Sequence, residues 1–321
     1  MALRRATSRF AHDVQKLGER ELATIKEALP GFESTGLVGP QGVRHASQLA
    51  VKTRMKSVKN IQKITKAMKM VAASKMRSAQ VLTEQSRGIV EPLVKLLGDM
   101  PATEAEKNLT VPVSSDRGLC GGINTSISKY ARSIINMNEA DGKEGSLAIL
   151  GEKAKAQLQR DMRSKIAVTI ADTTKVRLTF SQVSQITEDL LKQDFGAARI
   201  LYNRFVNAAT FKPTIATVLS PDTLEKNLEA GGKLDEYEIE GPDRSELLLD
   251  LCEFQMAATM YNAMCENACS EHASRMSAME NSTKNATEML GELTLLYNRS
   301  RQASITTELI EIISGASAIS G

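Results

Sequence analysis

Apolar and small residues recur with helical spacing over two long stretches, one near each end of the chain. No proline interrupts the first stretch between Gly42 and Pro92, and only Gly291 interrupts the second between Arg244 and Ser314. At 1.5 Å per residue the second helix would be roughly 110 Å long. These two patterns predict long terminal helices that fold back on each other as a close, left-handed, antiparallel coiled coil.

A seam with alternating spacings of three and four residues is the simplest interpretation of both patterns. On the first helix it predicts Val58, Ile61, Thr65, Met68, Ala72, Lys75, Ala79, Leu82, Ser86, Ile89, Leu93 and Leu96. On the second it predicts Leu251, Phe254, Ala258, Tyr261, Cys265, Ala268, His272, Arg275, Met279, Ser282 and Ala286, with further positions beyond. Polar residues in this seam would leave a two-stranded coil marginal, which favours a sheath of partner chains.

The middle of the chain changes to short β-rich runs that alternate with helical ones. Pro112 within the first run predicts an edge strand or a bulge. Strands are expected at 110–114, 147–150, 166–170, 198–203 and 214–219, and helices near 123–136, 152–160 and 181–192. A polar, acidic loop is expected from Pro221 to Pro242, where it leads into the last helix.

The predicted fold class is α + α/β, a long antiparallel coiled coil of the N- and C-terminal helices around a central α/β domain. The expected domains are an N-terminal extension at 1–41, a first coiled-coil helix at 42–105, the α/β domain at 106–242 and a second coiled-coil helix at 243–321.

The formal charge of +3 conceals a strong asymmetry along the chain. Between Ser34 and Thr83 there are ten basic residues and no acid, whereas from Asp243 onward eleven acids face five basic residues. Aromatic residues make up only 4% and Met reaches 14, a balance that suits helix interfaces better than an aromatic ligand pocket. The composition therefore favours interaction surfaces.

The N-terminal residues and the cysteines indicate in which cellular compartment the protein is found. Arg4, Arg5 and Arg9, with no acid before His12, are typical of the start of an organelle transit peptide, and a plain helical or disordered tail is the alternative. Four cysteines without a secretory leader predict free thiols in a reducing environment. No apolar run approaches the length of a membrane span.

A glycine-rich turn at 116–124 follows a predicted strand and opens a predicted helix. Such a turn could present backbone N–H groups to a phosphate, although neither GxxxxGK[ST] nor GxGxxG is present. A tight structural turn or a partner contact is the other interpretation.

Candidate chemistry is sparse elsewhere. Cys265, Cys269 and His272 share a helical face with a spacing that can bind a metal, but no fourth ligand is nearby, and apolar packing explains the thiols equally well. No GxSxG motif occurs. Asp116, Asp172 and Asp194 are most simply interpreted as turn or cap residues. We expect no catalytic residue, cofactor or metal on this chain.

The acid-free basic helix has three interpretations: a solvated face, a nucleic-acid surface or a face turned to protein partners. Val58, Ile61 and Met68 interleave with the lysines, so one side is committed to packing, unlike the basic region before a leucine zipper. A stand-alone coiled-coil scaffold or nucleic-acid-binding protein is thus the rival to a partner-organising role, and salt-dependent DNA binding would identify it.

Three segments resemble the γ subunit of rotary ATP synthases. They are residues 56–77, which resemble the family's N-terminal helix, 115–124, which resemble its central-domain motif, and 301–318, which resemble its C-terminal motif. The resemblance covers roughly residue 43 to the end and implies a Rossmann-like central domain. The arginine-rich extension points to the mitochondrial form.

The resemblance implies a function as the central-stalk rotor. The paired helices would form a shaft inside a ring of α and β subunits, and the α/β domain would form a foot on the ring of c subunits. Catalysis would belong to the partners, and the shaft would couple proton-driven rotation to conformational cycling. Other implied partners are the small δ- and ε-type stalk subunits, and no nucleic acid. The chain itself would not span the membrane but would lie at the matrix side of the mitochondrial inner membrane.

The resemblance also implies contact residues. Arg301 and Gln302 would contact β-subunit loops, with Thr306 and Glu308 as interface or packing residues nearby. On the basic face of the first helix, Lys66 and Lys69 would meet acidic β-subunit loops. The full set of predicted partner-contact residues is Lys66, Lys69, Arg301, Gln302, Thr306 and Glu308.

Overall fold

The computed structural model describes residues 40–97, 105–173, 178–229 and 243–320. By contacts the chain divides into two compact units, one of residues 54–295 and one of the residues on either side of that range. The predicted transit peptide lies almost wholly outside the described residues, as do residues 230–242 of the predicted acidic loop. The predicted domain boundaries stay a prediction.

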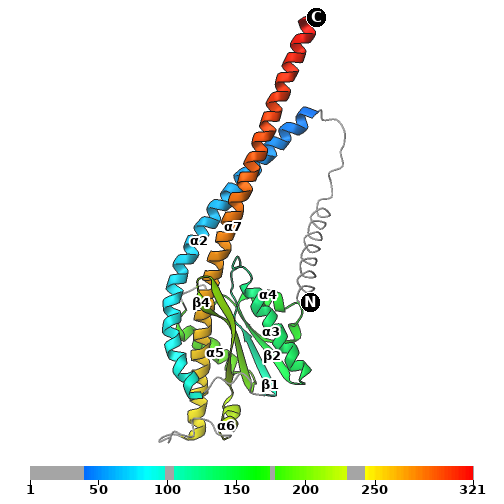
Figure 1. Cartoon of the computed structure of the whole chain (residues 1–321). Coiled ribbons are helices and arrows are strands. Elements are labelled where there is room, and N and C mark those ends of the chain that lie inside the picture. Colours follow the sequence, from blue (N-terminus) through cyan, green and yellow to red (C-terminus); the bar gives the residue numbers. More distant parts are fainter. Residues whose placement is uncertain (1–39, 98–104, 174–177, 230–242, 321) are drawn as a thin grey trace, which may run out of the picture. The chain divides into compact units, whose positions relative to one another are not determined.

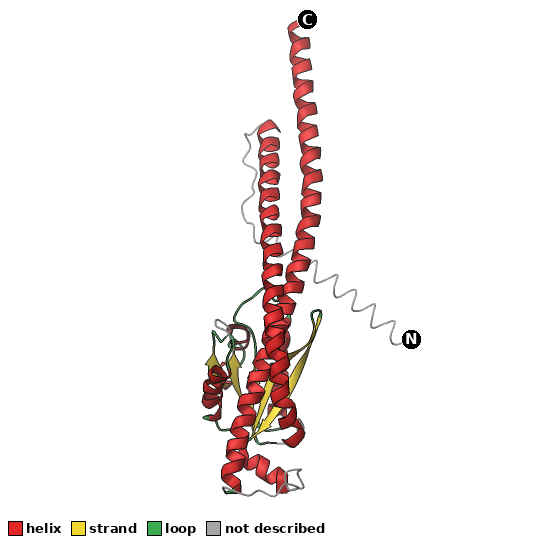
Figure 2. Ribbon diagram, turned by 90° about the vertical axis from the view of Figure 1, so that its left-hand side faces the viewer, coloured by secondary structure: helices red, strands yellow, loops and turns green. Residues whose placement is uncertain are grey.

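Two long helices dominate the described chain, α2 (Pro40–Leu97) and α7 (Arg244–Ser320). Within the 54–295 unit they run antiparallel, because partner numbers on α7 fall as those on α2 rise (Figures 1 and 2). The cross-helix contacts include Gln62 with Thr287 at 2.7 Å, Thr65 with Thr283 at 2.8 Å and Ser86 with Asn262 at 3.0 Å. The predicted antiparallel pair of terminal helices is confirmed.

The predicted seam is displaced by one residue at several of its alternate positions, although Met68 and Leu96 are half-buried and Arg275 is buried as predicted. The shared positions Val58, Thr65, Ala72, Ser86 and Leu93 are buried as predicted. Between them the spacing is four then three, so the predicted Ile61 and Ile89 are exposed and the next residue in each case turns toward α7. The same shift on α7 exposes Phe254 and buries Gln255.

The shift has a physical reason in the polar residues of the seam. Thr83 donates across the seam to the carbonyl of Cys265 at 3.1 Å, and Lys69 forms an ion pair with Glu280 at 3.1 Å. A search for apolar stripes passes over such positions, although a buried polar group with a partner packs as well as an apolar one. The coil is therefore held by small side chains and cross-helix hydrogen bonds.

The α/β domain is built on a five-stranded sheet with the order β3-β2-β1-β4-β5. Strands β1 (Lys107–Pro112), β2 (Glu144–Leu150), β3 (Ile166–Ile170) and β4 (Ala197–Asn207) pair in parallel, and β5 (Thr210–Leu219) closes the sheet antiparallel to β4. All five strands predicted from the sequence are present at nearly the predicted places.

The edge position predicted for the first strand is wrong, because β1 lies at the centre of the sheet. Pro112 is the last residue of the strand and pairs with Leu201. Val113 donates its N–H to the Leu201 carbonyl at 2.8 Å. The proline thus removes a donor only where the strand ends, which a central strand tolerates.

Helices cover both faces of the sheet (Figure 1). α3 (Ile123–Ala140) and α4 (Glu152–Leu158) pack with Leu147 and Ile149 on one face. α5 (Phe180–Leu191) and α7 pack with Ala148 and Leu150 on the other face. The alternation along β2 therefore feeds two separate cores, as a sheet buried on both sides requires. The remaining elements are a short 3₁₀ turn at Arg163–Lys165 and α6 (Pro221–Glu229).

The loop predicted from Pro221 is wrong over its first part, which forms α6. Pro221 is the first residue of this helix, a position that suits proline, and Ser220 accepts the N–H of Thr223 at 3.3 Å as a cap.

One buried carboxylate joins α2, α7 and the sheet. Glu266 on α7 is 1% exposed and accepts two hydrogen bonds from Arg87 of α2, at 2.6 and 3.0 Å. Glu266 also accepts the backbone N–H of Phe205 in β4 at 2.7 Å, and Arg87 donates to the carbonyl of the same residue at 2.7 Å. The ion pair with Glu266 raises the pKa of Arg87.

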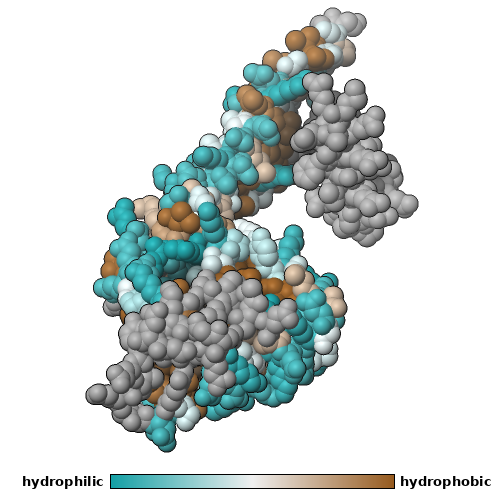
Figure 3. All heavy atoms as spheres, turned by 60° about the horizontal axis from the view of Figure 1, so that its bottom comes forward, coloured by the Kyte–Doolittle hydropathy of each residue, from teal (hydrophilic) through white to brown (hydrophobic). Residues whose placement is uncertain are grey.

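Apolar side chains also remain at the surface. Figure 3 shows brown, hydrophobic atoms among teal, hydrophilic ones on the face that it turns forward. Within the described residues of the 54–295 unit the exposed set includes Ile64, Met70, Val71, Leu119, Phe180 and Phe254. Several of these cluster at the cavities described below, which is typical of binding surfaces.

We expect Arg87→Ala to lower the free energy of unfolding by about 3 kcal/mol, because it leaves the Glu266 carboxylate buried without its cation. Urea unfolding followed by circular dichroism measures the loss. Lys95→Ala, which removes an exposed cation from the same helix, should change stability by less than about 0.5 kcal/mol. Equal losses in the two variants would contradict the role given to the pair.

Candidate functional site

The glycine-rich turn at 116–124 is closed by its own hydrogen bonds. Asn124, in the first turn of α3, accepts from the Ser115 N–H at 3.1 Å and donates to Ser115 Oγ at 2.7 Å. Ser115 Oγ in turn donates to the Arg117 carbonyl at 2.8 Å. These bonds join Ser115, Arg117 and Asn124 across the turn, as the structural interpretation requires.

Asp116 links the ends of three parallel strands. One of its carboxylate oxygens accepts the N–H of Glu152 after β2 at 3.2 Å and that of Asp172 after β3 at 3.1 Å. Gly151 precedes the first of these donors with φ 93°, and an added Cβ would lie 2.6 Å from the Ser114 carbonyl oxygen. The edge where an α/β sheet usually binds ligands is therefore occupied by the chain's own carboxylate.

The tip of the same turn is strained and tied to α7. Leu119 has φ 64°, an uncommon conformation for a non-glycine residue, and is 63% exposed. Ser274 donates to the Cys120 carbonyl at 2.6 Å, and Arg275 donates to the Gly118 carbonyl at 3.5 Å. These bonds hold the tip beside the helix pair.

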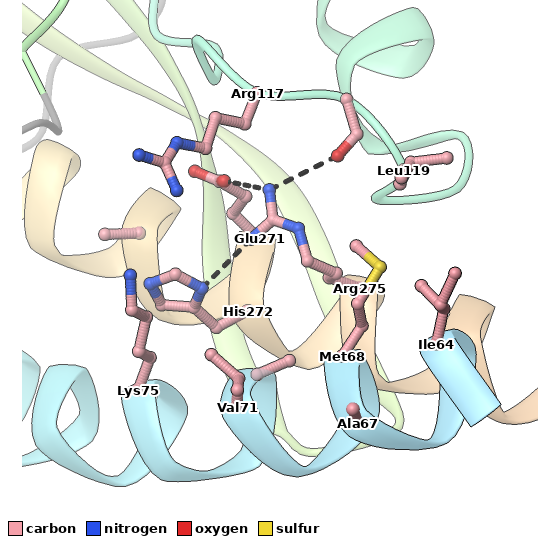
Figure 4. A pocket seen from close by; sticks show the side chains of 13 residues that line it. Ile64, Ala67, Met68, Val71, Lys75, Arg117, Leu119, Glu271, His272 and Arg275 are labelled. Carbon is pink, nitrogen blue, oxygen red and sulfur yellow. Dashed lines mark hydrogen bonds and ion pairs between the residues drawn. The ribbon is translucent and has the colours of Figure 1, made fainter.

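A cavity of about 520 Å³ lies between the tip, α2 and α7 (Figure 4). Its α2 wall is mainly apolar, and its other walls carry most of the charge. The lining residues are Ile64, Ala67, Met68, Val71, Ala72, Lys75, Arg117, Gly118, Leu119, Ala268, Glu271, His272 and Arg275. We call this space the neck cavity.

Arg275 is the centre of the polar side of the neck cavity. It forms an ion pair with Glu271 one turn away and donates to His272 Nδ1 at 3.1 Å (Figure 4). Burial raises the pKa of Glu271, and the charge of Arg275 opposes that rise. Burial, together with the nearby cations Arg275, Lys75 and Arg117, lowers the pKa of His272 to about 4.

The neck cavity is net positive at neutral pH. His272 is then uncharged, so Lys75, Arg117 and Arg275 face only the carboxylate of Glu271, and a net charge of +2 remains. The lining holds no hydroxyl or thiol that could act as a nucleophile. Apolar walls with surplus cations provide a binding site for an acidic segment that carries apolar side chains.

A second groove between the same helices contains the predicted Lys66 and Lys69. It has a volume of about 660 Å³ and includes Lys63 and Lys284 among its lining. Lys69 is paired with Glu280, whereas Lys66 is exposed. The structure thus places the two predicted lysines in one basic groove and gives Lys69 an intramolecular partner that the sequence analysis missed.

The other predicted contact residues lie on α7 in the second unit. Arg301, Gln302, Thr306 and Glu308 are all exposed. Thr306 donates to the Gln302 carbonyl at 2.9 Å, a bond within the helix. Their role as contacts remains a prediction.

The candidate metal ligands serve the helix seam. Cys265 and Cys269 are buried, and burial raises the pKa of their thiols to about 11 and about 12. His272 is engaged with Arg275 instead. No cluster of His, Cys, Asp or Glu suited to a metal ion occurs within the described part of the chain.

Sequence reasoning missed the neck cavity although one signal was present. Glu271 and Arg275 stand four residues apart, the spacing of a helical ion pair, directly beside the seam. What the sequence could not give is that Arg117, more than 150 residues away, faces the same pair.

A search of the helices within the described ranges finds none with the length and hydropathy of a membrane span.

Comparisons with known proteins agree on one family. A family model described as ATP synthase matches residues 47–319. A protein called ATP synthase subunit gamma, mitochondrial, from Ipomoea batatas is 54% identical over 88% of this chain and 89% of its own length. The protein of the same name from Arabidopsis thaliana is 51% identical over 94% of each chain, and an ATP synthase gamma chain of Roseobacter denitrificans is 38% identical over 84% of this chain and 98% of its own.

Solved structures give the same result. A chain in the Euglena gracilis mitochondrial ATP synthase, in a structure described as OSCP/F1/c-ring in rotational state 3, matches with a TM-score of 0.76. It is 25% identical, over 86% of this chain and 95% of its own length. A chain of the central stalk and c-ring of the Tetrahymena thermophila enzyme matches with a TM-score of 0.56 at 28% identity, over 68% of this chain and 98% of its own.

We expect the stability of the parent chain to fall as pH is lowered from about 6.5 to about 4, because the unfolded chain then takes up a proton on His272 and the folded chain does not. In His272→Gln this loss should be smaller, by on the order of 2 kcal/mol. Urea unfolding at pH 7, 5.5 and 4.5 measures it. Glu271 is present in both proteins, so its opposite contribution largely cancels.

His45→Gln makes the same change on the other long helix, α2, and serves as the control. If this control flattens the pH dependence as much as His272→Gln, the buried neutral imidazole is not its cause.

Proposed function

The chain belongs to the ATP synthase gamma-subunit family, and we propose that it acts as the rotating central shaft that couples proton-driven rotation to the catalytic cycle of surrounding α and β subunits. In this role it catalyses nothing itself. The paired helices of α2 and α7 are the shaft, and the sheet domain is the foot that contacts the ring of c subunits and the small stalk subunits. Its place is peripheral, on the matrix side of the mitochondrial inner membrane, after removal of an N-terminal import segment.

The observation that carries this proposal is the surplus of positive charge beside apolar surface along one helix pair. The neck cavity has a net charge of +2, and the groove of Lys63, Lys66 and Lys69 lies between the same two helices. A shaft inside a ring must meet equivalent loops in turn, and exposed cations can bind acidic loops reversibly through charge-assisted bonds.

The seam supports the same role. Small side chains such as Ala72 and Ala258 let the helices approach closely, and cross-seam bonds such as Ser86 to Asn262 fix their register. A thin shaft of fixed register can present different faces to different subunits without changing its own structure. This matches coupling through conformational states of the partners.

We assign the remaining contacts in the terminal unit to exposed polar side chains. Arg301 and Gln302 can donate several hydrogen bonds to carboxylate or carbonyl groups of a ring-subunit loop. Thr306 and Glu308 lie one to two turns further along α7, as interface or packing residues. Lys66 provides a free cation in the basic groove, and Lys69 must exchange Glu280 for a partner carboxylate.

The test compares ATP hydrolysis by a mixture of α and β subunits with and without this chain, and follows a bead attached to the foot. The parent chain should stimulate hydrolysis and show stepwise rotation. Arg301→Ala with Gln302→Ala should reduce the rate about tenfold, because charge-assisted bonds of this kind contribute roughly 1.5–3 kcal/mol.

The control is Asn298→Ala with Arg299→Ala, which removes an amide and a guanidinium one turn earlier on the same exposed helix. It should rotate as the parent does. If the parent chain assembles but never rotates, the shaft role is wrong. If the parent rotates and the Arg301 and Gln302 variant rotates equally well, only the assignment of these contacts is wrong.

A further inference from the structure

A third cavity, of about 620 Å³, lies between α5 and the first turns of α7. The two helices lie side by side on one face of the sheet (Figure 1), where Val183 and Leu190 of α5 share a core with Met256 and Met260 of α7. The cavity is lined by Phe180, Ser184, Thr187, Glu188, Leu191, Lys192, Asp250, Glu253, Phe254 and Ala257. We call it the α5–α7 groove.

Two phenylalanines line the groove without being needed by the core. Phe254 is 48% exposed and Phe180 is 38% exposed, in a chain with only seven phenylalanines. Phe180 is held in place by an edge-to-face contact with Tyr261, with ring centroids 5.7 Å apart. Exposed aromatic rings that are fixed in position and surrounded by polar groups are typical of the centre of a protein interface.

The charged residues of the groove are mainly acidic. Among the described residues that line the groove, Glu188, Asp250 and Glu253 face one cation, Lys192, which gives this lining a net charge of −2. That cation is already engaged on α5, because Lys192 pairs with Glu188 at 3.2 Å and with Asp189 at 3.1 Å. Asp250 and Glu253, on the α7 side, therefore remain available to a partner's cations.

The dimensions suit a short helix. α5 has 12 residues and so is about 18 Å long, which gives room for roughly three turns of a helix laid between it and α7. An amphipathic helix in a groove between two helices uses apolar anchors one turn apart, and the two rings offer such contact points. The negative net charge of the groove disfavours an acidic partner helix and favours a basic one.

We propose that the α5–α7 groove docks a basic amphipathic helix of a partner chain. Its apolar side lies against Phe180 and Phe254, and its Lys or Arg side chains pair with Asp250 and Glu253. The surface has the opposite charge to the neck cavity, so the two would select different partners. The proposal rests on the proposed function only in that the complex supplies further chains, and not on the shaft contacts.

A binding titration tests the chemistry of the groove. The probe is a fluorescent helical peptide of 14 residues made of Leu and Lys, with the leucines on one face, and its counterpart has Glu in place of each Lys. The Lys peptide should bind the full chain at low salt through the acids of the groove, whereas binding of the Glu peptide, which the neck cavity can accept, should not depend on those acids. Asp250→Asn with Glu253→Gln should weaken binding about tenfold or more, and Phe254→Ser should do the same.

The matched control is Asp222→Asn with Glu225→Gln, which neutralises two exposed acids on α6. It should leave the dissociation constant within about twofold of the parent. Circular dichroism shows that each variant is folded before it is titrated. Equal binding of the Lys peptide by the groove variant and the α6 variant would overturn the proposal, as would an equal loss of both peptides in the groove variant.

Cross-linking in the assembled complex identifies the occupant. A zero-length reagent that joins carboxylates to amines should link Asp250 or Glu253 to a lysine of a different chain, and Asp250→Asn with Glu253→Gln should abolish the link. Links only to Lys192, or to a second copy of this chain, would overturn the proposal. Neither result affects the rotation assay, so failure here is distinct from failure of the shaft role.

Discussion

The buried Glu266 carboxylate is the constraint on which the relation between the helices and the sheet depends. A carboxylate that is 1% exposed persists only if its partners stay in place, and those partners come from α2 and from β4. Any shift of α2 along α7, or of either helix over the sheet, removes at least one of them. The same contact that lets a charge be buried therefore fixes where three elements meet.

The rest of the seam extends this principle with neutral groups. Thr65 meets Thr283, and Thr83 meets the Cys265 carbonyl, only in the observed register, although each hydroxyl also bonds to a carbonyl of its own helix. An apolar seam of small residues tolerates slippage, whereas a slip here would lose each cross-helix bond at a cost of about 0.5–1.5 kcal/mol. The polar groups of the seam therefore set its register, while the small apolar side chains provide its packing. Apolar residues that lie outside the seam are then free to line binding surfaces.

The sequence predicted the elements better than their contacts. The strands of the sheet domain and the helices α3, α4 and α5 follow from local pattern, whereas α6 lies where a loop was expected, and the two long helices follow from long stretches without proline. The shifted seam did not, because Gln62 and Thr83 look like surface residues until their partners on α7 are known. Pro112 misled for a related reason, since its effect depends on the position within the strand. The neck cavity needs Arg117 beside Glu271, a relation that no local pattern contains.

Several bonds tie the sheet to α7 besides the Glu266 contact. Asn203 donates to Asn267 at 3.0 Å, Ser270 donates to the Asn203 carbonyl at 2.8 Å, and Ser274 donates to the Cys120 carbonyl at 2.6 Å. They are spaced along about two turns of one helix and act at a distance from each other. A twisting force applied to the sheet would have to stretch all of them together, so this part of the molecule is torsionally stiff, and elastic energy would be stored in segments beyond it.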